Sequence, residues 1–195
     1  MLDQDFLEYV RQCYQEFTNH DAEQSDRLDR FRNIEPESAE YLYMQIMVQQ
    51  SKQILEIGTS TGYSTLWLAK AAKSTLGVVD TVEIDPKRIA IAKQNAKQLK
   101  LDELINFNQL DALDYLSNNH KLYDFILLDA ERSAYISYWS SLSGLIREKG
   151  GLLIVDNVIS HASEVAEFIS MIENDSQFTT YTLKIGAGLL LVARQ

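Results

Sequence analysis

Ile54-Leu55-Glu56-Ile57-Gly58-Thr59-Ser60-Thr61-Gly62-Tyr63-Ser64 is the stretch that decides the fold. Its apolar beginning predicts a buried strand over 53–57, and the helical spacing that follows predicts a helix over about 63–73. A glycine directly after a buried strand lets the backbone turn sharply and approach a ligand, and the next helix offers unpaired N–H groups to an anion. The stretch therefore indicates a ligand-binding loop, or a strand–turn–helix junction whose glycines serve only the turn.

Apolar runs and helical patterns alternate from this stretch to the C-terminus. Further strands are expected at 77–84, 104–109, 123–129 and 151–156, and helices at 86–99, 112–118, 135–147 and 163–173. The last two runs, 177–184 and 188–194, are too close for a parallel crossover, so we expect an antiparallel hairpin. The pattern predicts an α/β fold with a doubly wound, mostly parallel seven-stranded sheet and a C-terminal antiparallel hairpin.

The part before this alternation is expected to be a helical cap segment, residues 1–50, on a single domain that spans 1–195. Helical spacing predicts a helix over 3–17, and Pro36 starts a second helix that runs to about residue 50. The polar stretch 18–30 between them is expected to be a loop or a frayed helix. No repeat and no linker-like composition divides the chain.

The charge balance limits the partners. With 18 Lys+Arg and 28 Asp+Glu, the net charge is −10, which disfavours nucleic acid and acidic membrane surfaces. The single cysteine cannot form an internal disulfide, the N-terminus has no apolar signal-peptide core, and no apolar run is long enough to span a membrane. We therefore expect a cytoplasmic protein with a small-molecule partner.

Two acidic residues stand where strands of the predicted sheet end. Glu83 closes the second strand and could accept both hydroxyls of a ribose, and Asp111 closes the third and could accept from an adenine edge. Each also fits a plainer role, a solvated strand end or a helix N-cap. Together with the glycine loop they indicate a nucleoside cofactor. Ser60 occupies the second glycine position of a dinucleotide fingerprint, which disfavours a nicotinamide oxidoreductase.

Three oxygen-bearing side chains follow the next two strands. Asp129 ends the fourth strand, and Asp156 and Asn157 end the fifth. Neighbouring strand ends place these groups side by side, and two carboxylates with an amide carbonyl suit Mg²⁺ first, or Mn²⁺ or Ca²⁺. The alternative is a helix cap at Asp129 and an Asx turn at Asp156-Asn157.

At these residues the sequence resembles the metal-dependent class I S-adenosylmethionine O-methyltransferases, which include catechol and caffeoyl-CoA O-methyltransferases and small bacterial relatives. The segments that carry the resemblance are LEIGTSTGYSTLWLA, VEIDP, YDFILLDAERSAYISYW, GGLLIVDNV and IGAGLLLVARQ. The resemblance implies methylation of one hydroxyl of a vicinal aromatic diol, and a homodimer. It assigns the methionine end of the cofactor to Glu56, Gly58, Ser60 and Ser64, the ribose to Glu83, the adenine to Asp111 and Ala112, and the metal to Asp129, Asp156 and Asn157.

One departure from the family concerns the group that removes the proton. The family commonly has a lysine base three residues after the first metal aspartate, where this chain has Arg132. A guanidinium stays protonated, so Arg132 could stabilise a phenolate. Removal of the proton would then be left to water or His161, or to the metal, which lowers the pKa of the hydroxyl. Ala187 also replaces an acid that is common in the hairpin turn. Two alternatives stay open: methylation of a hydroxylated tRNA uridine, and a protein that binds the cofactor without catalysis.

Overall fold

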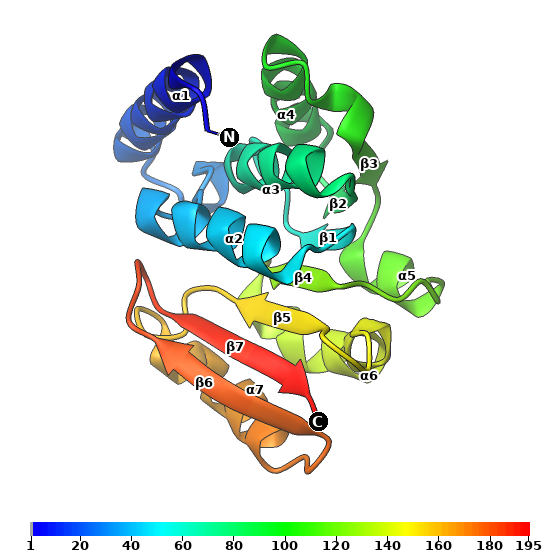
Figure 1. Ribbon diagram of the computed structural model, residues 1–195. Coiled ribbons are helices and arrows are strands. Elements are labelled where there is room, and N and C mark those ends of the chain that lie inside the picture. Colours follow the sequence, from blue (N-terminus) through cyan, green and yellow to red (C-terminus); the bar gives the residue numbers. More distant parts are fainter. Residues whose placement is uncertain (1) are drawn as a thin grey trace.

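Seven strands form one sheet in the order β3-β2-β1-β4-β5-β7-β6 (Figure 1). The computed structural model describes residues 2–195. Strands β1 to β5 run parallel, whereas β7 is antiparallel to both β5 and β6. The predicted fold class is therefore confirmed. The strands are β1 Gln53–Ile57, β2 Val78–Glu83, β3 Ile105–Gln109, β4 Phe125–Leu128, β5 Leu152–Val155, β6 Phe178–Leu183 and β7 Leu189–Arg194.

Helices cover both faces of the sheet. Successive side chains along each strand point to opposite faces and pack into two separate hydrophobic cores. Ile54 and Leu127 pack with helices α1 to α4, while Leu55 and Leu128 pack with α5 to α7. The long helices are α1 Gln4–Glu23, α2 Pro36–Gln49, α3 Tyr63–Thr75, α4 Pro86–Gln98, α5 Ala112–Ser117, α6 Tyr135–Leu145 and α7 Ala162–Glu173. Short 3-10 turns are η1 Arg27–Asp29, η2 Asp102–Leu104 and η3 Arg132–Ala134. Within residues 2–195, no helix has the length and hydropathy needed to cross a bilayer.

The N-terminal segment differs in one respect from the sequence prediction. Helix α1 continues to Glu23, beyond the predicted end at residue 17, and η1 follows within the stretch expected to be loop or frayed helix. The Asp21 carboxylate accepts hydrogen bonds from the N–H groups of Phe31 (2.7 Å) and Arg32 (2.8 Å). The end of α1 is therefore held by tertiary contacts that helical periodicity does not reveal. Residues 24–34, hereafter the strap, connect α1 to α2.

Candidate functional site

A cavity of about 660 Å³ opens where the parallel strands end, beneath the strap. Gly58, Glu83, Asp129 and Asn157 reach it from the ends of β1, β2, β4 and β5. Ligands of open α/β sheets bind at this edge, and the volume suits a small molecule. Of the predicted site residues, those that line the cavity are Gly58, Ser60, Ser64, Glu83, Asp111, Ala112, Asp129, Arg132 and Asn157.

The loop after β1 depends on one glycine. Gly58 has a φ of +102°, and a Cβ there would overlap the backbone carbonyl of Asp129. Ser60 also has a positive φ, and its Oγ donates to the Phe31 carbonyl oxygen at 2.8 Å, which ties the loop to the strap. The loop therefore takes its shape from two close approaches, one to the end of β4 and one to the strap.

Glu83 is fixed by three backbone N–H groups. Its Oε2 accepts from Ser60 N at 2.9 Å, and its Oε1 accepts from Ile84 N and Asp85 N, each at 3.0 Å. A carboxylate oxygen has two lone pairs, so Oε1 is fully used and Oε2 keeps one for a ligand hydroxyl. The geometry holds this carboxylate rigidly at the cavity wall.

Asp111 is a helix N-cap, which is the plainer of its two predicted roles, and it also lines the cavity. Its Oδ1 accepts from Leu113 N (2.7 Å) and Asp114 N (3.3 Å), which makes it the N-cap of α5. Two apolar side chains that periodicity did not single out, Ile84 and Leu110, line the same part of the cavity and are 64% and 37% exposed. Together they offer an apolar surface of the kind a flat ring covers.

Glu56 lies beneath the cavity and not in its wall. The side chain is fully buried and accepts hydrogen bonds from the hydroxyls of Ser64 (2.6 Å), Thr65 (2.5 Å) and Thr81 (2.5 Å). Burial raises the pKa of this carboxyl to about 7, although the three hydroxyls act in the opposite direction. In the structure Glu56 positions Ser64, which does reach the cavity.

Asp129, Asp156 and Asn157 come together as the sequence predicted. The Asn157 Nδ2 donates to Asp129 Oδ1 and to Asp156 Oδ2, both at 3.1 Å, and Asn157 has a φ of +68°. Asp156 is buried, and its Oδ1 has no hydrogen-bond partner among the described residues. Burial raises the pKa of both aspartates, and their mutual repulsion adds to the rise for Asp156.

These three residues suit a hard divalent cation. An unpartnered, buried carboxylate oxygen calls for a donor or a cation, and a half-turn of the Asn157 amide would place its Oδ1 between the carboxylates. Within residues 2–195, no group of three or more His, Cys, Asp or Glu side chains is arranged to hold a metal. The candidate set therefore depends on the amide as its third donor.

Arg132 and His161 line the same cavity. Arg132 is buried, and its Nε donates to Glu164 Oε2 at 2.8 Å. His161 directly precedes α7, and its Nδ1 lies 2.9 Å from Ser160 Oγ.

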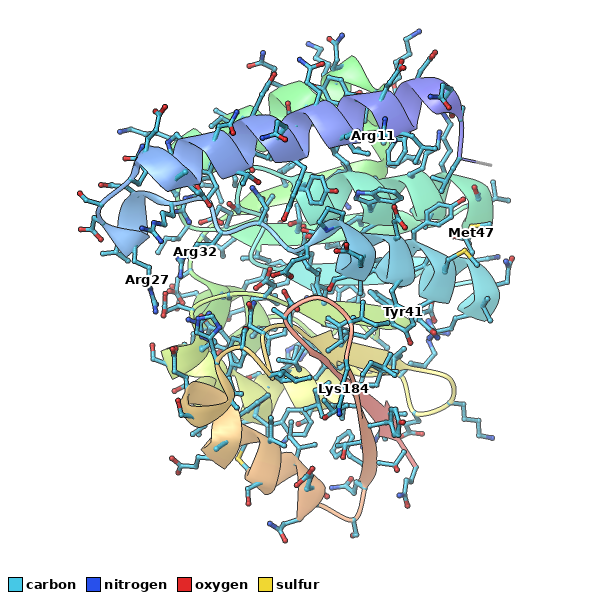
Figure 2. The ribbon with its side chains drawn as sticks, turned by 90° about the vertical axis from the view of Figure 1, so that its left-hand side faces the viewer. Arg11, Arg27, Arg32, Tyr41, Met47 and Lys184 are labelled. Atoms are coloured by element: carbon cyan, nitrogen blue, oxygen red, sulfur yellow. The ribbon has the colours of Figure 1, made fainter. Side chains whose placement is uncertain are left out.

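The strap supplies residues that the sequence patterns missed. Arg27 and Arg32, both labelled in Figure 2, lie in the strap. They pair with Glu131 at 2.5 and 3.3 Å and so join the strap to the loop after β4. Glu35, the residue after the strap, and Asn33 also line the cavity. No local pattern marks these residues, because the strap has no periodicity and its place depends on tertiary contacts.

Solved structures share this fold over the whole chain. A methyltransferase of Podospora anserina bound to S-adenosylhomocysteine (SAH) has a TM-score of 0.82 at 19% identity and covers 100% of this chain and 89% of that one. An O-methyltransferase of Bacillus cereus in complex with SAH has a TM-score of 0.80 at 24% identity, with coverage of 100% and 93%.

Curated relatives match in sequence over a shorter range. A catechol O-methyltransferase of Niastella koreensis is 33% identical over 131 residues, which are 65% of this chain and 58% of that enzyme. A catechol O-methyltransferase of Mycobacterium tuberculosis is 33% identical over 121 residues, 60% and 53% of the two chains. These matches span little more than half of each relative. The family model described as O-methyltransferase, however, matches residues 8–195, and the chain belongs to this family.

Proposed function

We propose that this protein transfers the methyl group of S-adenosylmethionine to a hydroxyl of a small catechol-like acceptor, at a site that holds a divalent cation. The observation that carries the proposal is that one cavity joins the fixed carboxylate of Glu83 to the Asp129–Asn157 pair. A nucleoside-bearing methyl donor and a cation-bound acceptor would thus meet in one space. Relatives named catechol O-methyltransferase support the choice of acceptor.

The residues of the chain have distinct tasks in this mechanism. Glu83 would accept from the ribose through Oε2, and Ile84 and Leu110 would cover the adenine. Asp129, Asp156 and Asn157 would hold the cation, which lowers the pKa of a hydroxyl bound to it. Arg132, fixed by Glu164, would stabilise negative charge on the attacking oxygen but could not take its proton. The proton would pass to water or to His161, which lines the same cavity. Positioning of the two reactants supplies much of the remaining rate enhancement.

Two measurements test the proposal separately. Isothermal titration with SAH should show a single binding site, and the absence of binding would overturn the whole proposal. Methyl transfer from S-adenosylmethionine to catechol should require added Mg²⁺ and should be lost in EDTA. Asp156→Asn should abolish transfer, whereas the matched change Glu167→Gln at an exposed acid of α7 should leave it unchanged. Full activity of Asp156→Asn in EDTA would refute the metal site but would leave the binding of the cofactor untouched.

One observation favours a second acceptor class, a hydroxylated tRNA uridine. Five arginines line the cavity of this acidic protein, namely Arg27, Arg30, Arg32, Arg88 and Arg132. The net charge of −10 and the pairing of Arg27 and Arg32 with Glu131 argue against a free phosphate-binding surface. Parallel assays with catechol and with bulk tRNA lacking the methyl group would show which acceptor is used.

A further inference from the structure

We propose that Glu35 is a third carboxylate of the Asp129–Asp156 site, where its negative charge increases the affinity for a divalent cation. The inference rests on the proposed function, because it concerns the same cation. It adds a residue from the opposite end of the chain sequence to a site otherwise built from β4 and β5.

The surroundings of Glu35 are not those of an ordinary helix cap. Glu35 is the N-cap residue of α2, yet its side chain makes no capping hydrogen bond. It lines the cavity together with Asp129 and Asn157. Its Oε2 is shielded from solvent and has no hydrogen-bond partner among the described residues. A buried carboxylate oxygen without a donor is costly, so the capping role does not account for this position.

The turn between β6 and β7 holds Glu35 at the aspartate end of the cavity. A Cβ at Gly186 would lie 3.0 Å from Glu35 Oε2, so the turn sits directly on this carboxylate. The next residue, Ala187, accepts from Ile159 N (3.0 Å) and Ser160 N (2.9 Å), just after Asn157 in the chain. Figures 1 and 2 show the turn, close to the labelled Lys184, rising to the start of α2.

Electrostatics link Glu35 to both aspartates. Glu35 lines the same cavity as Asp129, and the Asn157 amide joins Asp129 to Asp156. The nearby cations Arg32 and Arg132 also line this cavity, but they are already paired with Glu131 and Glu164. The three carboxylates repel one another in a poorly solvated space, and two of them have a buried oxygen without a hydrogen-bond partner. This arrangement favours the binding of a cation of charge +2.

The contribution of Glu35 is one of charge and not of direct ligation. In the described part of the chain, no three acidic, histidine or cysteine side chains form a ligand set. Asp129, Asp156 and Asn157 would therefore bind the ion, and Glu35 would act from beyond bonding distance. Groups just outside a metal's ligands commonly change its affinity 10- to 100-fold.

The test is a titration of the whole protein with Mn²⁺, followed by electron paramagnetic resonance, with SAH present. Glu35→Gln keeps the shape of the side chain and removes its charge, and Glu37→Gln makes the same change at an exposed acid of the same helix. We expect about tenfold weaker Mn²⁺ binding for Glu35→Gln and unchanged binding for Glu37→Gln. Glu35→Asp, which keeps the charge, should recover most of the affinity, and SAH affinity measured in EDTA should be the same in all variants.

The outcomes separate this inference from the proposed function. Equal Mn²⁺ affinity of Glu35→Gln and Glu37→Gln would overturn the role of Glu35, while loss of binding in Asp129→Asn would still support the cation site. Failure of the unmodified protein to bind Mn²⁺ would overturn the cation site and the inference with it. If Glu35→Asp binds Mn²⁺ as weakly as Glu35→Gln does, the shape of the side chain matters and its charge does not. This result too would refute the inference.

Discussion

The Nε of Arg132 donates to Glu164 Oε2 at 2.8 Å, so a side chain of α7 fixes a guanidinium in the wall of the cavity. The pairing leaves the terminal nitrogens of Arg132 without a hydrogen-bond partner among the residues described here. If Arg132 stabilises charge on the attacking oxygen, Arg132→Ala should lower kcat for methyl transfer to catechol about 100-fold. The affinity for SAH should not change.

Arg147 provides the control for this substitution, because it pairs with Asp124 at 2.8 Å and does not line the cavity. Arg147→Ala should keep the kcat of the unmodified protein. Near-normal kcat in Arg132→Ala would remove Arg132 from the mechanism.

Glu83→Gln should weaken SAH binding 10- to 100-fold. The new amide would place an NH₂ group against backbone N–H donors or in the position that now accepts from a ligand hydroxyl. Hydrogen bonds to a charged group contribute about 1.5–3 kcal/mol, which corresponds to this range of affinity. Isothermal titration measures the effect, with Glu103→Gln, an exposed acid before β3, as the control. Unchanged affinity would show that Glu83 does not contact the cofactor.

Gly58→Ala should destabilise the protein by about 2–4 kcal/mol. The residue has a φ of +102°, and a methyl group would overlap the carbonyl oxygen of Asp129, so the end of β4 would have to move. Urea unfolding followed by circular dichroism gives the free energy. Gly144→Ala, in α6 with open space around it, should instead stabilise the protein by up to about 1 kcal/mol. Similar free energies for the two variants would contradict this account of the loop.

Glu56 should make the stability depend on pH between about 4.5 and 7. Burial raises its pKa in the folded protein from 4.5 to about 7, so in this range the folded state binds the proton and the unfolded state does not. The stabilisation from this residue is complete below pH 4.5 and is lost as the pH rises to 7, by roughly 3 kcal/mol in all.

The comparison of the unmodified protein with Glu56→Gln isolates this effect, because Asp129 and Asp156 also have raised pKa values. Urea unfolding at several pH values should give a difference in free energy that changes over this range and is constant above it. A constant difference across the range would contradict the raised pKa of Glu56.

Much of the fold follows from local patterns in the sequence. The strands appear as short apolar runs because both faces of a parallel sheet are buried, and the close spacing of the last two runs requires a hairpin. The end of α1 was missed because its last turn is polar and depends on Asp21, which binds backbone groups ten residues further along.

The candidate site was predictable to the extent that strand ends define it. Asp129, Asp156 and Asn157 meet because β4 and β5 are adjacent and parallel. The sequence does not show whether a strand residue faces a cavity or lies below it. The resemblance therefore assigned Glu56 to the methionine end of the cofactor together with Ser64, although only Ser64 lines the cavity. Glu35 carries no local signal, because its place depends on a turn from the far end of the chain.

The contact between Gly186 and Glu35 has a consequence for the newly made protein. One residue belongs to the last turn of the chain and the other to the segment before the sheet begins. During synthesis the N-terminal helices and the parallel strands leave the ribosome first. The contacts behind Glu35 and behind the turn after Asn157 form only when the final hairpin emerges and docks beside β5. A chain cut before this hairpin would therefore keep the residues that line the cavity but lack the support that fixes Glu35 and Asn157 at its aspartate end.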